Sequence, residues 1–248
     1  MKRLIKLILT LMLIVFTGIS LYVVYFSSIK KKPLVEFGKK EVLAHFEFLS
    51  REELEKWEEK SFVQNKTSYR VMSYGARKCV KAMSENSASA LFLKERLFSD
   101  KNPFISWEWK VERFPSLKRK EALDKKAEFD FSAQVYVVFF SRFFLKTKAI
   151  QYVWAKEVPV GTVVSSPYTN NVKILVLASG ESDEWRKEER DINKDFKELF
   201  SSEEDKDVMG IAFMTDSDST GSNAVAYYDE IEFGYETKVS LRRLASNT

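Results

Sequence analysis

Two aspartates in one loop are the strongest candidates for chemistry in this chain. Asp216 and Asp218 lie in the segment Met214-Thr-Asp-Ser-Asp-Ser-Thr-Gly221, which joins two apolar stretches. Alternating oxygen-bearing residues followed by a glycine are typical of the first half of a calcium-binding loop. An EF-hand would also need a glutamate at the position of Tyr227 and flanking helices, so that kind of site is excluded. The alternative is a polar hairpin loop whose residues simply make the turn.

A third aspartate, Asp229, lies in a stretch that alternates like a β-strand. The apolar residues between Val225 and Phe233 share one face, and a period of two places Asp229 on that face. A carboxylate among apolar side chains is costly unless it is hydrogen-bonded, ion-paired or bound to a metal. We therefore expect Asp229 either to share a calcium ion with the two loop aspartates or to pair with an arginine or a hydrogen-bond donor.

Aromatic side chains are a second kind of candidate, because their faces pack well on the C–H faces of sugar rings. The aromatic residues considered are Trp107, Trp109, Tyr136, Trp154 and Trp185. Trp107 and Trp109 fall on the apolar face of their stretch, so we expect both in the core. Trp154 is retained as a candidate ligand-binding residue.

A charged run supplies further candidates. Arg190 and Asp191 end the run Glu188-Glu189-Arg190-Asp191, and Asp195 follows shortly after. These residues could bind a polar ligand, or they could form a solvated charged face with ion pairs of small energetic value. The sequence alone leaves both interpretations open.

The elements that must position these residues are mostly β-strands. Residues from Ile105 to Val111 alternate apolar and polar side chains, and Phe129 to Phe140 repeats the pattern. Further strand candidates are Ser68–Met72, Ala90–Leu93, Ile150–Ala155, Lys173–Ala178, Val208–Met214 and Ala224–Phe233. The helical signals are an amphipathic stripe over Asp191–Phe200 and the charged segment Arg51–Lys60. This pattern predicts an all-β fold, an antiparallel two-sheet β-sandwich of jelly-roll type with one or two short helices.

Charge is distributed unevenly along the chain. The sequence has 40 Lys and Arg and 36 Asp and Glu; six of the basic and none of the acidic residues lie in the first 32 positions, which leaves 34 basic and 36 acidic residues for the rest. That balance provides no basic face for a phosphate backbone, so we expect no nucleic-acid partner. The single histidine, His45, excludes His-cluster metal sites, and the single cysteine, Cys79, excludes an internal disulfide framework. We expect both residues to be structural.

The segment Leu7 to Phe26 contains 20 residues without a charge. A helix of this length spans about 30 Å, the thickness of the hydrocarbon core of a bilayer. The alternative is a cleaved signal peptide, but no A-x-A-like cleavage site follows the segment. Basic residues flank both ends, so charge alone does not set the orientation. We expect an uncleaved single-pass anchor in the bacterial cytoplasmic membrane, with the body facing the periplasm or the exterior, because a short basic head before a long apolar run is typical of such signals.

These observations divide the chain into four parts. We expect a membrane anchor over residues 1–29, a basic linker over residues 30–40, a single β-sandwich domain over residues 41–236 and a tail over residues 237–248. The linker is expected because residues 30–40 are basic and contain a proline.

Several sequence strings, in their order and spacing, resemble one bacterial family. They are WEWKVERFP, FDFSAQVYVVF, IQYVWA, SSPYTNNVKILVLASG, WRKEERDINKDFKELF and GIAFMTDSDSTGSNAVAYYDEIEF. The resemblance is to the domain-of-unknown-function family number 3047, and it extends from about Phe46 to Phe233. The activity of this family is not established, so the resemblance implies an architecture without a reaction.

The resemblance also implies a set of matching and altered positions. The central strand of the family carries a pair of aspartates and an arginine; here Phe129 replaces the first aspartate, Asp130 keeps the second and Gln134 stands at the arginine position. The other matching positions are Arg190-Asp191, Asp195, Asp216-x-Asp218-x-Thr220 and Asp229. If the family's pair forms a ligand site, this member has an altered one.

Taken together, the sequence predicts a membrane-anchored binding module for an envelope glycan or a similar polar ligand. The candidate ligand-binding residues are Asp130, Gln134, Trp154, Arg190 and Asp191, and the candidate ligands of a structural calcium ion are Asp216, Asp218 and Asp229. One alternative is an enzyme acting on glycans through two carboxylates, which must lie about 5 to 9.5 Å apart. The other is a structural component of an envelope protein complex that binds no small ligand.

Overall fold

The computed structural model describes residues 39–143 and 146–237. Residues Lys40–Thr237 form one compact unit. The predicted membrane anchor, Leu7 to Phe26, lies outside the described residues. Within the part of the chain that is described, no helix combines the length and the apolar character that a membrane crossing requires.

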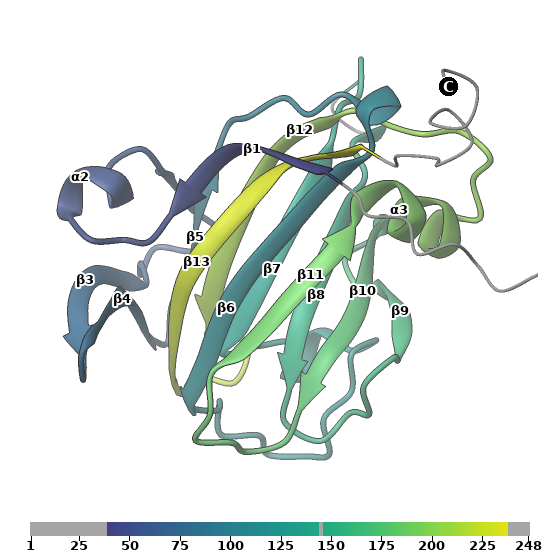
Figure 1. Ribbon diagram of the computed structural model, residues 1–248. Helices are drawn as coiled ribbons and strands as arrows, with labels where there is room; N and C mark the ends of the chain where they lie inside the picture. Colours follow the sequence, from purple (N-terminus) through teal and green to yellow (C-terminus); the bar gives the residue numbers. More distant parts are fainter. Residues whose placement is uncertain (1–38, 144–145, 238–248) are drawn as a thin grey trace, which may run out of the picture. The chain divides into compact units, whose positions relative to one another are not determined.

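The described chain is an all-β sandwich of two sheets, as the alternating pattern predicts (Figure 1). The six-stranded sheet has the order β11-β6-β13-β4-β3, with β1 paired to β13. The bounds of its strands are β1 (Lys39–Phe46), β3 (Ser68–Tyr74), β4 (Arg77–Glu85), β6 (Pro103–Arg113), β11 (Arg186–Asp191) and β13 (Asn223–Thr237). The last strand therefore lies inside this sheet, between β4 and β6.

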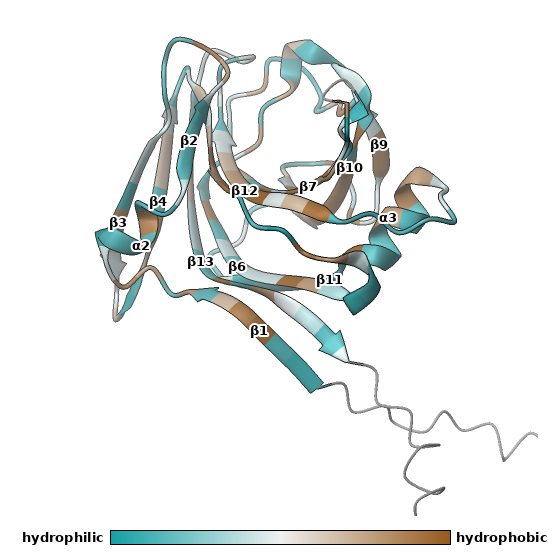
Figure 2. Cartoon of the chain, turned by 90° about the horizontal axis from the view of Figure 1, so that it is seen from above, coloured by the Kyte–Doolittle hydropathy of each residue, from teal (hydrophilic) through white to brown (hydrophobic). Residues whose placement is uncertain are grey.

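The seven-stranded sheet has the order β2-β5-β12-β7-β8-β10-β9. The bounds of its strands are β2 (Glu58–Ser61), β5 (Ala88–Leu93), β7 (Ala133–Phe139), β8 (Ala149–Ala155), β9 (Val163–Ser166), β10 (Thr169–Ser179) and β12 (Val208–Asp216). Figure 2 shows this sheet as a curved layer whose two ends, β2 and β9, turn to the same side, so that its face away from the six-stranded sheet is concave. The expectation of a wholly antiparallel arrangement is wrong for one pair, because β8 and β10 run parallel.

Helices are few and short. The α-helices are α2 (Arg51–Leu54) and α3 (Ile192–Phe200), and the 3₁₀ turns are η1 (Ser99–Lys101) and η2 (Lys126–Glu128). The amphipathic stripe predicts α3 correctly: Ile192 and Phe196 are buried, and Asp191 caps the helix by accepting the backbone N–H of Lys194 at 3.0 Å. The other charged segment forms only one helical turn before β2 begins.

The main core lies between the two sheets and is rich in aromatic rings. Trp107 and Trp109 are fully buried there, as their alternation predicts, with ring centroids 5.3 Å apart in an edge-to-face arrangement. From the other sheet, Tyr152 and Trp154 pack against them, with centroid distances of 5.4 and 6.0 Å.

The central strand is shorter than the sequence pattern predicts. β7 begins at Ala133, and its residues Val135 and Val137 belong to the core between the sheets. Phe129 and Phe131 instead pack in a second apolar cluster with residues of β8 and β10. The single continuous face predicted from Phe129 onward is therefore wrong, because residues 129–132 precede the strand and pack in a different cluster.

A β-bulge interrupts β13. The register with β6 shifts between Asp229 and Glu232, and Glu230 adopts a left-handed φ of 51°. As a result Tyr228 and Ile231 both reach the core although they are three residues apart. The single face predicted from Val225 to Phe233 is wrong, since the bulge exchanges the two faces of the strand after Asp229.

Candidate functional site

The concave face of the seven-stranded sheet carries polar side chains at its centre. In β7, β8 and β12 every second residue enters the core between the sheets, and the intervening residues point to the concave side. Those intervening residues include Gln134, Tyr136, Gln151, Met214 and Asp216. Because β7 pairs with β8 and with β12, neighbouring strands bring these side chains together.

A pocket of about 380 Å³ opens on this face. Its apolar lining residues are Phe62, Val63, Ala88, Phe129, Tyr136, Tyr168, Val172 and Met214, and its polar ones are Gln151, Ser166, Thr169, Asp216, Asp218 and Ser219. Phe62 and Tyr168 are 65% and 58% exposed, whereas Gln151 and Asp216 are 1% and 5% exposed. Exposed rings therefore accompany buried polar groups in one pocket.

Three carboxylates gather beside the pocket. Asp130, Asp216 and Asp218 each offer an oxygen within 4.8 Å of the others. Asp130 accepts the backbone N–H of Ser219 at 3.0 Å, and both the N–H and the hydroxyl of Thr220, at 2.7 and 2.6 Å. Its role in the fold is thus to hold the turn after β12 against the segment that precedes β7.

Asp216 is held by one oxygen only. Its Oδ1 accepts the backbone N–H of Phe131 at 2.6 Å and the side-chain amide of Gln134 at 2.7 Å. The amide oxygen of Gln134 in turn accepts from the Tyr136 hydroxyl at 2.8 Å and from Gln151 Nε2 at 2.7 Å. The network fixes the carboxylate while its second oxygen, Oδ2, accepts no hydrogen bond from the described residues.

The electrostatics of the cluster favour protonation or a bound cation. Burial raises the pKa of Asp216 well above its ordinary value, and the charge of Asp130 adds to the effect. Burial and Asp130 also raise the pKa of Asp218. Among the described residues, no lysine, arginine or histidine forms an ion pair with any of the three carboxylates.

The cluster could hold a metal ion only through a few oxygens. Calcium takes six to eight oxygen ligands. Both oxygens of Asp130 and one oxygen of Asp216 already accept hydrogen bonds. This leaves Asp216 Oδ2 and the half-buried Asp218 as the main ligands that the protein offers.

Asp229 does not join this cluster. It lies on the outer face of the six-stranded sheet, where Arg77 Nε is 3.0 Å from its Oδ2, and Arg77 Nη2 is 2.7 Å from Glu108. Burial raises the pKa of Asp229 to about 7. Of the two arrangements expected for Asp229, the structure has the ion pair with an arginine. Asp229 is not grouped with Asp216 and Asp218, so these three residues do not share a calcium ion.

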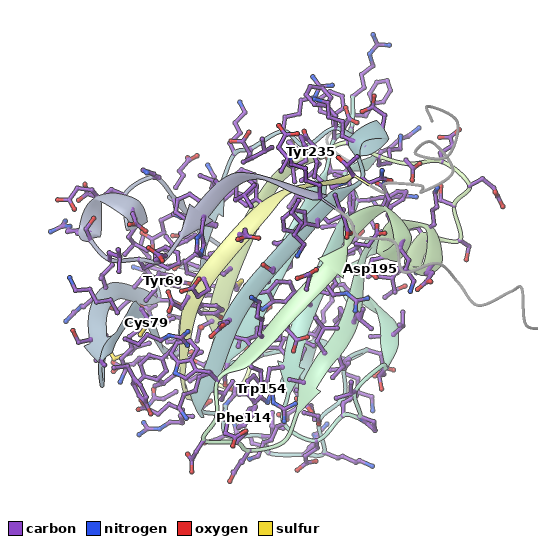
Figure 3. All side chains as sticks on the ribbon, viewed as in Figure 1. Tyr69, Cys79, Phe114, Trp154, Asp195 and Tyr235 are labelled. Carbon is purple, nitrogen blue, oxygen red and sulfur yellow. The ribbon has the colours of Figure 1, made fainter. Side chains whose placement is uncertain are left out.

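The remaining candidates, Trp154, Arg190 and Asp191, do not line the pocket. Figure 3 labels Trp154 and also Asp195, the ion-pair partner of Arg190. Trp154 is fully buried between the sheets and donates its indole N–H to the Gly180 carbonyl at 2.9 Å. Because no face of its ring is exposed, the expected ligand-binding role of Trp154 is wrong. Arg190 forms a two-point ion pair with Asp195, at 2.7 and 2.5 Å, and Asp191 caps α3. Neither Arg190 nor Asp191 lines the pocket.

Sequence reasoning missed the rim of the pocket. Phe62 follows β2, and Tyr168 lies in the turn between β9 and β10. Gln151 is on the face of β8 opposite Tyr152, so the alternation of that strand could have indicated it. Nothing in the sequence distinguishes Phe62 or Tyr168 from core aromatic residues.

The matched family is described as a protein of unknown function, DUF3047, and its model matches residues 55–232. The chain belongs to this family. The match confirms the resemblance carried by the strand motifs and includes every described candidate residue. No curated protein matches the chain. The description of the DUF3047 family assigns no activity.

The solved structures similar to this DUF3047 member include the following two. One is a family 11 carbohydrate-binding module from Clostridium thermocellum in complex with a β-1,3-1,4-mixed-linked tetrasaccharide, with 12% identity, a TM-score of 0.38 and coverage of 80% of this chain and 96% of that chain. The other is a protein of unknown function with a galectin-like fold from Bacillus subtilis, with 7% identity, a TM-score of 0.39 and coverage of 82% and 100%.

Proposed function

We propose that this protein is a binding module for a glycan or a similar polar ligand, and that the ligand occupies the pocket on the concave face. The observation that supports this best is the combination of exposed rings, Phe62 and Tyr168, with buried polar groups, Gln151 and Asp216. Binding sites for small polar molecules are typically apolar clefts with a few fixed polar groups.

Each part of the pocket has a role in this proposal. The rings at the rim pack on the C–H face of a sugar, as aromatic side chains do on apolar ring faces. Asp216 Oδ2 accepts a hydroxyl of the ligand, and the network through Gln134 holds it in place before binding. Fixing a polar group in advance reduces the entropy lost when a ligand binds.

A glycan array probed with the full-length protein tests the proposal. The protein is kept in an uncharged detergent without a sugar headgroup, so that the detergent does not compete. We expect binding to a restricted set of glycans, and we expect Tyr168→Ala to weaken it at least tenfold. The control is Phe143→Ala, since Phe143 is also exposed, at 62%, but does not line the pocket. Absence of binding to any glycan would reject the proposal.

We also propose that the sandwich has a jelly-roll topology. Residues Leu7 to Phe26 are proposed to anchor the protein in the bacterial cytoplasmic membrane, with the sandwich in the periplasm or outside the cell. Its support is the uncharged apolar run itself. A reporter fused after Thr248 tests the orientation: activity on the outer side is expected, and activity restricted to the cytoplasm would reject it.

One observation favours a second function, hydrolysis of a glycan. Burial raises the pKa of Asp216, and a raised carboxyl pKa is what a general acid needs. The nearest oxygens of Asp216 and Asp218 lie within 4.8 Å, which is shorter than the separation of about 5 to 9.5 Å between glycosidase carboxylates. Release of new reducing ends from a bound glycan, abolished by Asp216→Asn, would support the enzyme. Binding of a glycan without release of new reducing ends would support the binding module instead.

A further inference from the structure

The pocket has a pronounced charge asymmetry. Its lining includes two carboxylates, Asp216 and Asp218, and no lysine, arginine or histidine. The third carboxylate, Asp130, lies within 4.8 Å of both. A ligand with its own carboxylate or phosphate would add a further negative charge to a site that has no positive one.

A ligand must also replace the water that solvates these carboxylates. Asp216 is only 5% exposed. Both of its hydrogen bonds from the described residues go to Oδ1, so Oδ2 accepts none from them. Covering it with a neutral group leaves the buried charge compensated by hydrogen bonds alone. A positively charged donor compensates the charge and fills the same hydrogen bond, and charge-assisted bonds are stronger than neutral ones.

The apolar part of the pocket suits a cation too. Four of its lining residues, Phe62, Phe129, Tyr136 and Tyr168, are aromatic, and ring faces attract cations. Tyr168 already shows this property, because the ammonium group of Lys126 lies 5.0 Å from its ring centroid. Lys126 itself does not line the pocket.

We infer that the pocket selects glycans that carry a protonated amine, with the ammonium group placed between Asp216, Asp218 and the aromatic wall. This inference rests on the proposed function and narrows its ligand class. It predicts a preference for amino sugars over their hydroxyl and N-acetyl counterparts, and no binding of sugars that carry a carboxylate.

Matched ligands test the preference. Calorimetry on the full-length protein at pH 6.5, in the same uncharged detergent, compares four β-1,4-linked glucose-type tetrasaccharides that carry an amine, an N-acetyl group, a hydroxyl or a carboxylate. We expect the amine form to bind at least tenfold more tightly than the hydroxyl form. Equal affinity for these two would overturn the inference and leave the proposed function intact. No binding of any form, together with a negative glycan array, would remove both.

Charge-removing variants locate the effect. Asp216→Asn keeps the oxygen that accepts from Phe131 and Gln134, and the more exposed Asp218→Asn guards against loss of folding in the first variant. In each variant the amine affinity should fall to within about threefold of the hydroxyl affinity measured for the same variant. Asp100→Asn removes an exposed carboxylate that does not line the pocket, and it should change nothing. An unchanged amine preference in both pocket variants would overturn the inference.

Adding a chelator distinguishes direct binding of the ammonium group to the carboxylates from binding through a metal ion. If the ammonium group binds them directly, a chelator leaves the amine affinity unchanged and millimolar calcium lowers it by competition. Loss of amine binding on addition of chelator would mean that a metal ion bridges ligand and protein, and would overturn direct recognition of the amine.

Discussion

The side-chain amide of Gln134 donates a hydrogen bond to Asp216 Oδ1 over 2.7 Å, and this bond links β7 to β12 on the concave face. The amide oxygen of Gln134 also accepts hydrogen bonds from the Tyr136 hydroxyl and from Gln151 Nε2. One buried amide therefore makes hydrogen bonds to three neighbouring side chains. Gln134 is neutral, so it orders the Asp216 carboxylate without neutralising it.

Replacing Gln134 by leucine should destabilise the fold. The change leaves Asp216 and the hydroxyl of Tyr136 short of buried partners, which costs on the order of 1 to 3 kcal/mol. Chemical denaturation monitored by tryptophan fluorescence measures the difference. Tyr168→Ala, at an exposed rim residue, is the control and should lie within about 0.5 kcal/mol of wild type. A Gln134→Leu protein as stable as the control would show that the network is dispensable.

The ion pair beside α3 is expected to be structural. Asp195 is 1% exposed and accepts from Arg190 and from the Tyr152 hydroxyl, at 2.7 Å in each case. Asp195→Ala strands a half-buried arginine and should cost about 3 to 5 kcal/mol. Asp191→Ala removes the helix cap and should cost about 0.5 to 2 kcal/mol. Equal losses in the two variants, measured by denaturation, would contradict this ranking.

Asp229 should make stability depend on pH. Its pKa in the folded protein is raised from 3.8 to about 7, so the folded state favours the protonated form. The stabilisation associated with that proton is complete below the unfolded pKa and is lost as pH rises from about 4 through 7. The carboxyl faces Arg77, Glu108 and Glu230.

The measurement is the difference in melting midpoint between wild type and Asp229→Asn. Wild type should gain on the variant as pH falls from 8 to 5, since the asparagine does not titrate. A difference that is constant with pH, or that moves the other way, would mean that Asp229 is ionised throughout this range.

Calcium should bind the aspartate cluster weakly. Asp216 and Asp218 have no cationic partner among the described residues, but few of the cluster's oxygens are free of hydrogen bonds. Stabilisation follows RT ln(1 + [L]/Kd), which is about 0.4 kcal/mol when calcium equals its Kd. We expect a small rise in melting midpoint from chelator to 10 mM calcium, absent in Asp218→Asn. A rise that persists in the variant would place any calcium elsewhere.

Alternation predicts the fold well where each strand has one core face. Trp107 and Trp109 were assigned to the core on this basis, and the two sheets bury both. The charged strand β11 was not predicted, because Arg186–Asp191 pairs only with β6 at the sheet edge and has no apolar face to reveal its period.

Four of the candidate residues lie together in the fold. The sequence assigned Asp130 and Gln134 to ligand binding and Asp216 and Asp218 to a calcium ion, and only the fold shows these four side chains as one group. The face of Asp229 was not predictable, since it depends on a bulge whose left-handed residue, Glu230, is not of a type that favours that conformation.

The place of β13 inside its sheet affects how the protein can be synthesised. Until residues from Asn223 onward leave the ribosome, β4 and β6 have no strand between them and present open edges to the surrounding solution. In the folded sheet Tyr228 pairs with Val80 on one side and with Trp109 on the other. Neither residue can make this contact before Tyr228 has been synthesised. The nascent chain therefore exposes apolar surface and unpaired backbone for most of its synthesis, and we expect it to depend on chaperones until the final strand is inserted.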